Sequence, residues 1–218
     1  MTGETTRPKA RRTSAGTAEP AATAPEGAAA PRGRVRSGGR SEKVRRAVAQ
    51  AVLDLLAEGV VDFGPSEVAA RADLNRKTIY RWWPTYADLV REGLAAHSGA
   101  VEVPDTGSWA KDLRLLADRL AAFFAGPVEV STSAIIAGRR NPELSTLILE
   151  HFEPIQESWR AVVARAAARG EIDPTCTPEA VVNLLVSQLV LAPLLLGRAS
   201  TGAEVDALVD LVLRATRR

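Results

Sequence analysis

The side chains most easily interpreted as chemistry lie between residues 76 and 81, where the sequence reads RKTIYR. An arginine can bridge O6 and N7 of guanine, a lysine binds phosphate or guanine, and a threonine methyl can contact the thymine methyl. A tyrosine hydroxyl can reach a phosphate oxygen. This mixture is typical of a helix that enters the major groove of DNA, and the candidate contacts are Arg76, Lys77, Thr78, Tyr80 and Arg81. A merely solvated helix face is the alternative.

Two short helices around a tight turn are predicted to position these side chains. Gly64-Pro65 starts the first helix, which runs to about Ala72, because glycine is accepted at an N-cap and proline suits the first turn. Asp73-Leu74 forms the turn. Asn75 caps the second helix, which must end near Pro84. The apolar residues spaced to pack the two helices together are Val68, Ala69, Leu74 and Ile79.

A longer helix is expected on each side of this pair. Ser41 is the candidate N-cap of the first, which Gly59 ends, and Thr85 caps a fourth that runs to about Ala96. Trp82 and Trp83 are expected to be packing residues, with Trp82 also near the DNA backbone. The further candidate phosphate contacts are Arg40, Arg45, Ser66, Thr85 and Tyr86. For Arg45, plain solvent exposure is the alternative.

From Arg45 to Val90 the chain resembles the DNA-binding domain of the TetR family of transcriptional regulators. The resemblance rests on four successive blocks, VAA at 68–70, DLN at 73–75, TIYRWWP at 78–84 and TYADL at 85–89. It implies a ligand-responsive regulator, usually a repressor, that binds a palindromic operator as a homodimer. It also implies that the C-terminal half dimerises and holds a small effector.

Three positions depart from the family pattern. Asp73 stands where the turn usually has glycine. Gly64 stands where serine or threonine usually caps the helix that here begins at Pro65, so Ser66 is the candidate substitute. Tyr86 stands where lysine is usual, which loses one charged phosphate contact. A helical accessory protein whose DNA-binding head has degenerated is therefore the runner-up interpretation.

Residues 1–40 are predicted to be a disordered basic tail. They contain eight Lys/Arg against three Glu, and only one large aliphatic residue, Val35. Such a segment cannot bury enough apolar area to offset its ordering entropy. The tail is either an arm that contacts DNA or a solubilising leader, and Arg32–Arg40, directly before the first helix, favours the arm.

The rest of the chain gives an all-α fold with a DNA-binding domain over 41–97 and a helical effector-binding and dimerisation domain over 98–218. Helices are expected at about 109–125, 127–139, 142–169, 177–198 and 202–216. Pro127, Pro142 and Pro178 sit where helices would start. Pro154 and Pro193 fall inside helical patterns, and each predicts a kink or a break.

The last two helices are the candidate dimer interface. The helix over 178–198 is apolar on nearly every side, so it must be buried on most of them. A monomer core is the alternative. The candidate effector contacts are apolar residues and a few polar anchors: Trp109, Phe123, Phe124, Leu147, His151, Phe152, Trp159, Asn183 and Gln188. Ordinary core packing is the alternative for the aromatic residues.

Several classes of function are disfavoured. One cysteine and two histidines leave no pattern for a zinc site, so we expect no metal and no cofactor. No nucleophile arrangement or phosphate loop appears, which argues against an enzyme. The longest apolar run, Leu189–Leu196, is shorter than the ~20 residues of a membrane-spanning helix, so a cytoplasmic protein without a membrane partner is expected.

Overall fold

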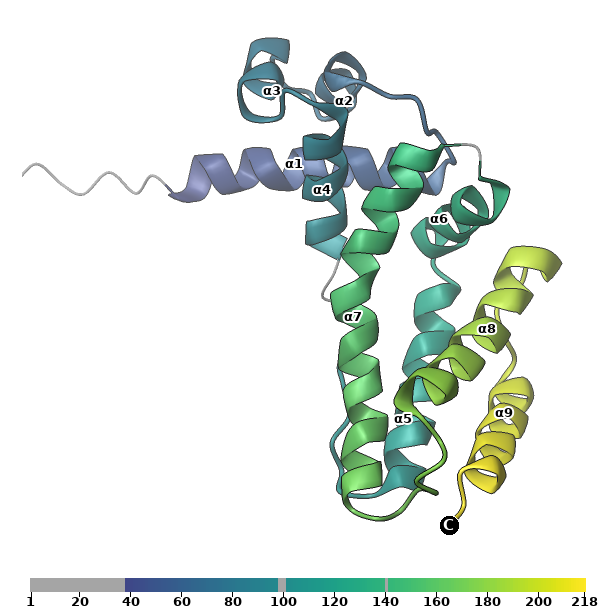
Figure 1. The fold of residues 1–218 in the computed structure, drawn as a ribbon. Coiled ribbons are helices and arrows are strands. Elements are labelled where there is room, and N and C mark those ends of the chain that lie inside the picture. The colour runs from purple at the N-terminus through teal and green to yellow at the C-terminus, as the bar shows by residue number, and fades with distance from the viewer. Residues whose placement is uncertain (1–37, 98–100, 140) are drawn as a thin grey trace, which may run out of the picture. The chain divides into compact units, whose positions relative to one another are not determined.

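A computed structural model describes residues 38–97, 101–139 and 141–218. These residues form helices and loops without a β-strand, which confirms the all-α prediction. The helices, in chain order, are α1 Gly38–Ala57, α2 Pro65–Arg71, α3 Arg76–Trp82, α4 Tyr86–His97, α5 Trp109–Phe124, α6 Pro127–Gly138, α7 Pro142–Ala168, α8 Pro178–Leu196 and α9 Gly202–Ala215 (Figure 1). The predicted tail over 1–40 lies almost wholly outside the described residues.

Local capping chemistry explains most of the helix starts. The Asn75 side chain accepts a hydrogen bond from the Lys77 N–H at 2.8 Å and caps α3, as predicted. Thr85 and Asp88 cap each other's backbone N–H at the start of α4, both at 3.1 Å. Prolines occupy the first turn of α2, α6, α7 and α8. The prediction for Ser41 was wrong, because α1 begins at Gly38 and Ser41 lies within it.

The turn between α2 and α3 takes a left-handed residue. Asp73 adopts φ 52°, the conformation for which glycine is the usual choice. Aspartate is among the few residues that tolerate it, since its short polar side chain bonds locally. The turn therefore forms with Asp73 in place of glycine.

The two internal prolines do not break their helices. Pro154 lies inside α7 and Pro193 inside α8, and both helices run through them. Of the kink or break expected at each proline, the break does not occur, and the kink stays a prediction. The packed surroundings of a helix can hold it together where proline removes one backbone hydrogen bond.

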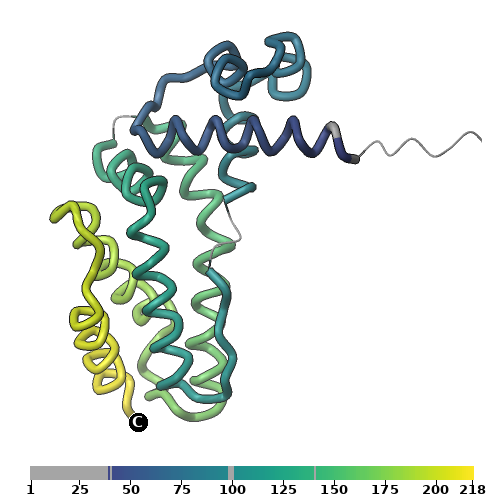
Figure 2. Tube along the Cα trace, turned by 180° about the vertical axis from the view of Figure 1, so that it is seen from behind, coloured from purple at the N-terminus to yellow at the C-terminus, as the bar shows by residue number. Residues whose placement is uncertain are grey.

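The helices bury two apolar clusters. The first unites α1 to α4, where Val68, Ala69 and Ile79 are almost fully buried as their spacing predicted. It also takes in Ile135 of α6 and Leu144, Leu147 and Ile148 of α7. The second cluster joins α5 to the lower part of α7 and to α8 and α9, and α9 runs beside α5 (Figures 1 and 2).

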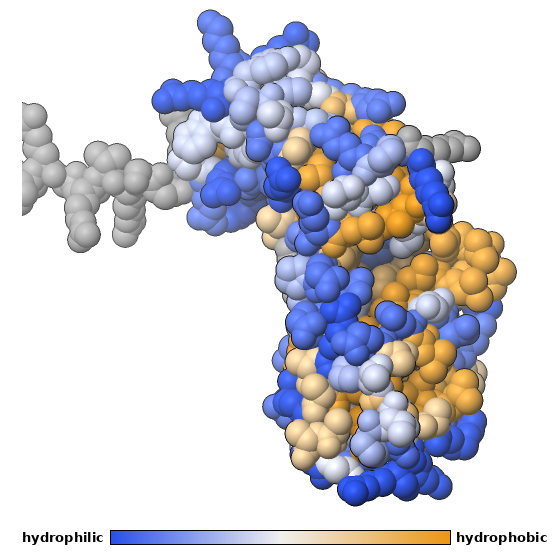
Figure 3. Space-filling view, viewed as in Figure 1, coloured by the Kyte–Doolittle hydropathy of each residue, from blue (hydrophilic) through white to orange (hydrophobic). Residues whose placement is uncertain are grey.

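Helix α8 is only partly covered within the chain. It packs on α5 and α7, yet Leu184, Leu191, Leu195 and Leu196 are exposed. A hydrophobic surface lies over the end of α8 (Figure 3). The expectation that α8 is buried on most sides thus fails for the single chain. By length and composition alone α8 is also long and apolar enough to cross a bilayer, which the length of its longest unbroken apolar run did not reveal.

Candidate functional site

The short helix α3 presents its cations to solvent. Ile79 is buried and anchors the helix, while Arg76, Lys77, Tyr80 and Arg81 are exposed. Within the described part of the chain, Arg76, Lys77 and Arg81 take part in no ion pair. Their charges are therefore available to an external anion, and all three lie on one short helix.

Two hydroxyl groups connect α2 to α3. The oxygens of Ser66 and Tyr80 lie 3.3 Å apart, and Tyr80 is half exposed. Thr78 is half-buried and borders a groove of about 240 Å³ together with Val44, Trp82 and Trp83. Ser66 and Tyr80 thus meet across the helix pair, whereas Thr78 faces the groove beside α1.

Tyr86 is turned inward. Its hydroxyl donates to the carbonyl of Val61 at 2.9 Å, and its ring packs on Phe63 with centroids 5.0 Å apart. Burial raises the pKa of the phenol to about 12, so it stays protonated and keeps its only donor on Val61. The expected phosphate contact from Tyr86 is therefore wrong. The hydroxyl of Thr85 is likewise engaged with Asp88, in the cap of α4.

Glu92 joins three parts of the head, the unit formed by α1 to α4. Its carboxylate accepts two hydrogen bonds from Arg45, both at 3.0 Å, and one from the indole N–H of Trp83 at 3.1 Å. Trp83 is buried as expected, between the end of α3 and α4. Trp82, however, is 57% exposed, so it does not pack into the core, and its place near the DNA backbone stays a prediction. Arg45 keeps a largely exposed side chain, and the side chain of Arg40 lies outside the described residues.

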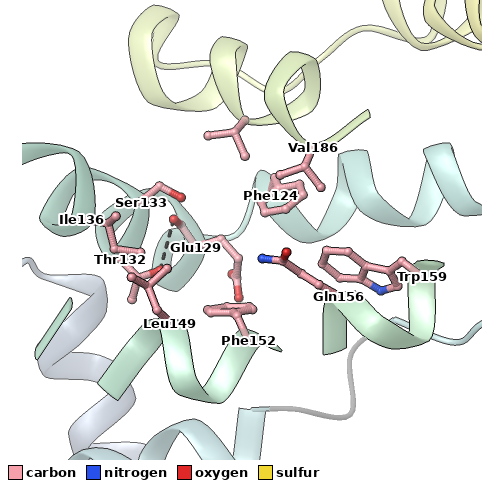
Figure 4. Close-up of a pocket in the computed structure, with 11 residues that line it drawn as sticks. Phe124, Glu129, Thr132, Ser133, Ile136, Leu149, Phe152, Gln156, Trp159 and Val186 are labelled. Carbon is pink, nitrogen blue, oxygen red and sulfur yellow. Dashed lines mark hydrogen bonds between the residues drawn. The ribbon is translucent and has the colours of Figure 1, made fainter. Parts of the chain in front are cut away.

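A cavity of about 130 Å³ lies among α5, α6, α7 and α8 (Figure 4). Three of the predicted effector contacts line it, namely Phe124, Phe152 and Trp159. Phe123 does not line it but packs edge-on against all three rings, with centroids 5.3–6.2 Å apart. His151 does not line the cavity either, and its ring lies edge-on to the Phe152 ring with the centroids 5.7 Å apart.

The remaining predicted contacts lie elsewhere. Trp109 is buried at the start of α5, where its indole N–H bonds the hydroxyl of Thr216 at 2.9 Å. Leu147 belongs to the core of the head. Asn183 and Gln188 are exposed on α8, because neither points into the bundle. None of these four residues lines this cavity, and Gln188 instead borders a second pocket with Glu204 and Leu208 of α9.

The sequence reasoning missed the polar wall of the cavity. Glu129, Thr132 and Ser133 come from α6, and Gln156 comes from α7. Glu129 is only 3% exposed and accepts a hydrogen bond from His97, the last residue of α4. That bond raises the pKa of His97 above its ordinary value. Glu129 follows Gly126-Pro127 by two residues, so the sequence offered only the signal of an acid in a first helical turn.

Comparison with known proteins agrees with this geometry. Residues 103–212 match the family described as Tetracyclin repressor-like, C-terminal domain. The chain is 31% identical over 170 residues to a DNA-binding transcriptional repressor TetR of Mycobacteroides abscessus, covering 76% of this chain and 89% of that one. It is 28% identical over 153 residues to the HTH-type transcriptional regulator AqdR of Rhodococcus erythropolis, covering 69% and 74%.

A solved structure gives the same fold. A TetR transcriptional regulator from Agrobacterium tumefaciens superposes with a TM-score of 0.65 at 22% identity, over 79% of this chain and 94% of that one.

Proposed function

The chain belongs to the TetR family of DNA-binding transcriptional regulators, and from that premise we propose that it is a homodimeric repressor released from its operator by a small effector. It works in the cytoplasm and uses no cofactor. The observation that carries the proposal is the set of exposed cations on α3, which form no ion pair within the residues that the structure describes.

Helix α3 is the recognition helix of the proposal. Arg76, Lys77 and Arg81 contact bases or phosphates, and Thr78 and Tyr80 complete the surface. Ser66 and Arg45 bind the backbone at its edge, while Thr85 supports α4 through its cap rather than through phosphate. Arg40 and the rest of the basic tail add salt-dependent affinity.

The dimer forms through α8 and α9. Exposed leucines on both helices support this interface, since an apolar surface of this kind is usually covered in a soluble protein. Two heads related by a two-fold axis would read two half-sites about one helical turn apart, which explains a palindromic operator.

The effector occupies the cavity bordered by Phe124, Phe152 and Trp159. Its wall includes Glu129, which is bonded to His97 at the end of α4, and α4 packs directly against α1 in the head. An occupant that disturbs this bond would change the position of α4, and it would shift the population away from the DNA-competent arrangement.

A gel shift with the DNA upstream of the chain's own gene tests the proposal. Arg76→Ala and Tyr80→Ala should each weaken specific binding by about tenfold, which is the worth of one good base or phosphate contact. Lys111→Ala, an exposed residue of α5, serves as the matched control and should bind like the parent. Absence of specific retardation at low salt would overturn the proposal and favour an accessory protein with a degenerate head.

A further inference from the structure

The chemistry of the cavity wall restricts which effector it can hold. Among the residues that line it, Glu129 is the only one with a charge, and the others are apolar, aromatic or neutral polar. A buried carboxylate is costly unless a positive or hydrogen-bonding group faces it, and His97 supplies one such partner to Oε1 of Glu129. Glu129 is therefore the one charged residue that lines the cavity.

The Glu129 carboxylate faces the cavity. Figure 4 shows it pointing between Phe152 and Gln156, with the Gln156 amide turned toward the same space. Gly126 makes room for it, because a methyl group at that position would overlap Oε2 of Glu129. The start of α6 also favours a negative charge there.

His97 occupies only part of the hydrogen-bond acceptor capacity of the Glu129 carboxylate. It bonds to Oε1, whereas a carboxylate has about four lone-pair sites on its two oxygens. The His97 side chain approaches from α4, and it is not among the residues that line the cavity. A ligand can thus reach Glu129 from the cavity without passing His97.

Aromatic rings complete the environment of the carboxylate. Phe124, Phe152 and Trp159 border the same space, and aromatic faces attract cations. The volume of about 130 Å³ suits a compact group, because a cavity of ~150 Å³ holds benzene. An anion would be repelled by the charge of Glu129, the one charged residue among those that line the cavity.

We propose that this cavity selects small aromatic or aliphatic amines in their cationic form, with Glu129 as the residue that reads the charge. The inference rests on the proposed function in that the occupant is taken to be the effector. The specificity itself depends only on the cavity, so binding can be measured without DNA.

The test compares three probes of the same shape and different charge: benzylamine, benzyl alcohol and benzoate. Ligand-detected NMR titrations at neutral pH should give benzylamine an affinity about tenfold above benzyl alcohol, with benzoate weakest. In Glu129→Gln, which keeps the shape, the preference should fall below about twofold. Unchanged binding of benzyl alcohol to that variant shows that the cavity is intact.

Asp118→Asn, which removes an exposed carboxylate of α5, is the matched control and should keep the preference. Equal affinities for benzylamine and benzyl alcohol in the parent chain, or a preference that survives Glu129→Gln, would overturn the inference. If Glu129→Gln does not fold, the three-probe series on the parent chain still decides.

A gel shift without probe separates this inference from the proposed function. Specific operator binding with no charge preference leaves the repressor standing and removes the cation site. A charge preference without operator binding does the opposite.

Discussion

Replacing Glu92 by leucine tests how the head holds its recognition helix. Glu92 is the common acceptor for Arg45 of α1 and for the indole of Trp83 at the end of α3. Leucine fills similar space but accepts no hydrogen bond. The variant thus leaves the Trp83 N–H without its partner and releases Arg45 to solvent.

The two losses differ in size because their burial differs. Trp83 is 5% exposed, and a buried donor without a partner costs about 1–3 kcal/mol. The Arg45 side chain is 62% exposed, so its ion pair is screened by solvent and contributes much less to stability. We expect Glu92→Leu to lower the free energy of unfolding by about 2 kcal/mol, and the melting temperature by roughly 4–8 °C.

Urea unfolding followed by tryptophan fluorescence measures this change. Arg45→Ala should destabilise the chain much less than Glu92→Leu does. Glu92→Gln, whose amide oxygen can still accept from Trp83, should also cost less than Glu92→Leu. Glu150→Leu, an exposed acid of α7, is the control. The reasoning would be refuted if Arg45→Ala destabilised the chain as much as Glu92→Leu does, because the indole contact would then contribute nothing.

Three further changes probe other contacts. Tyr86→Phe removes the hydrogen bond to Val61 and should cost about 1 kcal/mol in urea unfolding while leaving operator affinity unchanged; a large loss of DNA binding would restore a phosphate role. His97→Asn should destabilise the chain at about pH 6 and much less at about pH 9. The bond to Glu129 raises the pKa of His97, so its contribution to stability is complete below the pKa of the unfolded chain and is lost as the pH rises through the pKa of the folded chain. A difference in stability that does not change with pH would contradict this. Gly126→Ala should displace the Glu129 carboxylate and weaken benzylamine binding more than benzyl alcohol binding, and equal weakening would count against the cation site.

The sequence predicted features governed by local rules well and features governed by tertiary contacts poorly. The caps at Asn75 and Thr85 depend on residues two or three positions away, so they could be recognised from spacing alone. Tyr86 could not be assigned correctly, because its partner Val61 lies 25 residues earlier and its inward orientation depends on Phe63.

The cavity shows the same division. Aromatic residues such as Phe152 were identified because their type restricts their environment. Glu129 was missed because acids are common in first helical turns, and only the fold brings it opposite His97, 32 residues away. Asn183 and Gln188 were misplaced since an apolar helix gives no periodic signal for the face it buries.

The apolar cluster of the head extends beyond the helices that carry the DNA-reading residues. Ile135 from α6 and Leu144, Leu147 and Ile148 from α7 complete it. A fragment cut after α4 would expose this cluster to water, so the head should not fold stably when it is separated from α6 and α7. A chimeric regulator built from this chain should therefore carry α6 and the first half of α7 with the head, and the junction belongs further along α7.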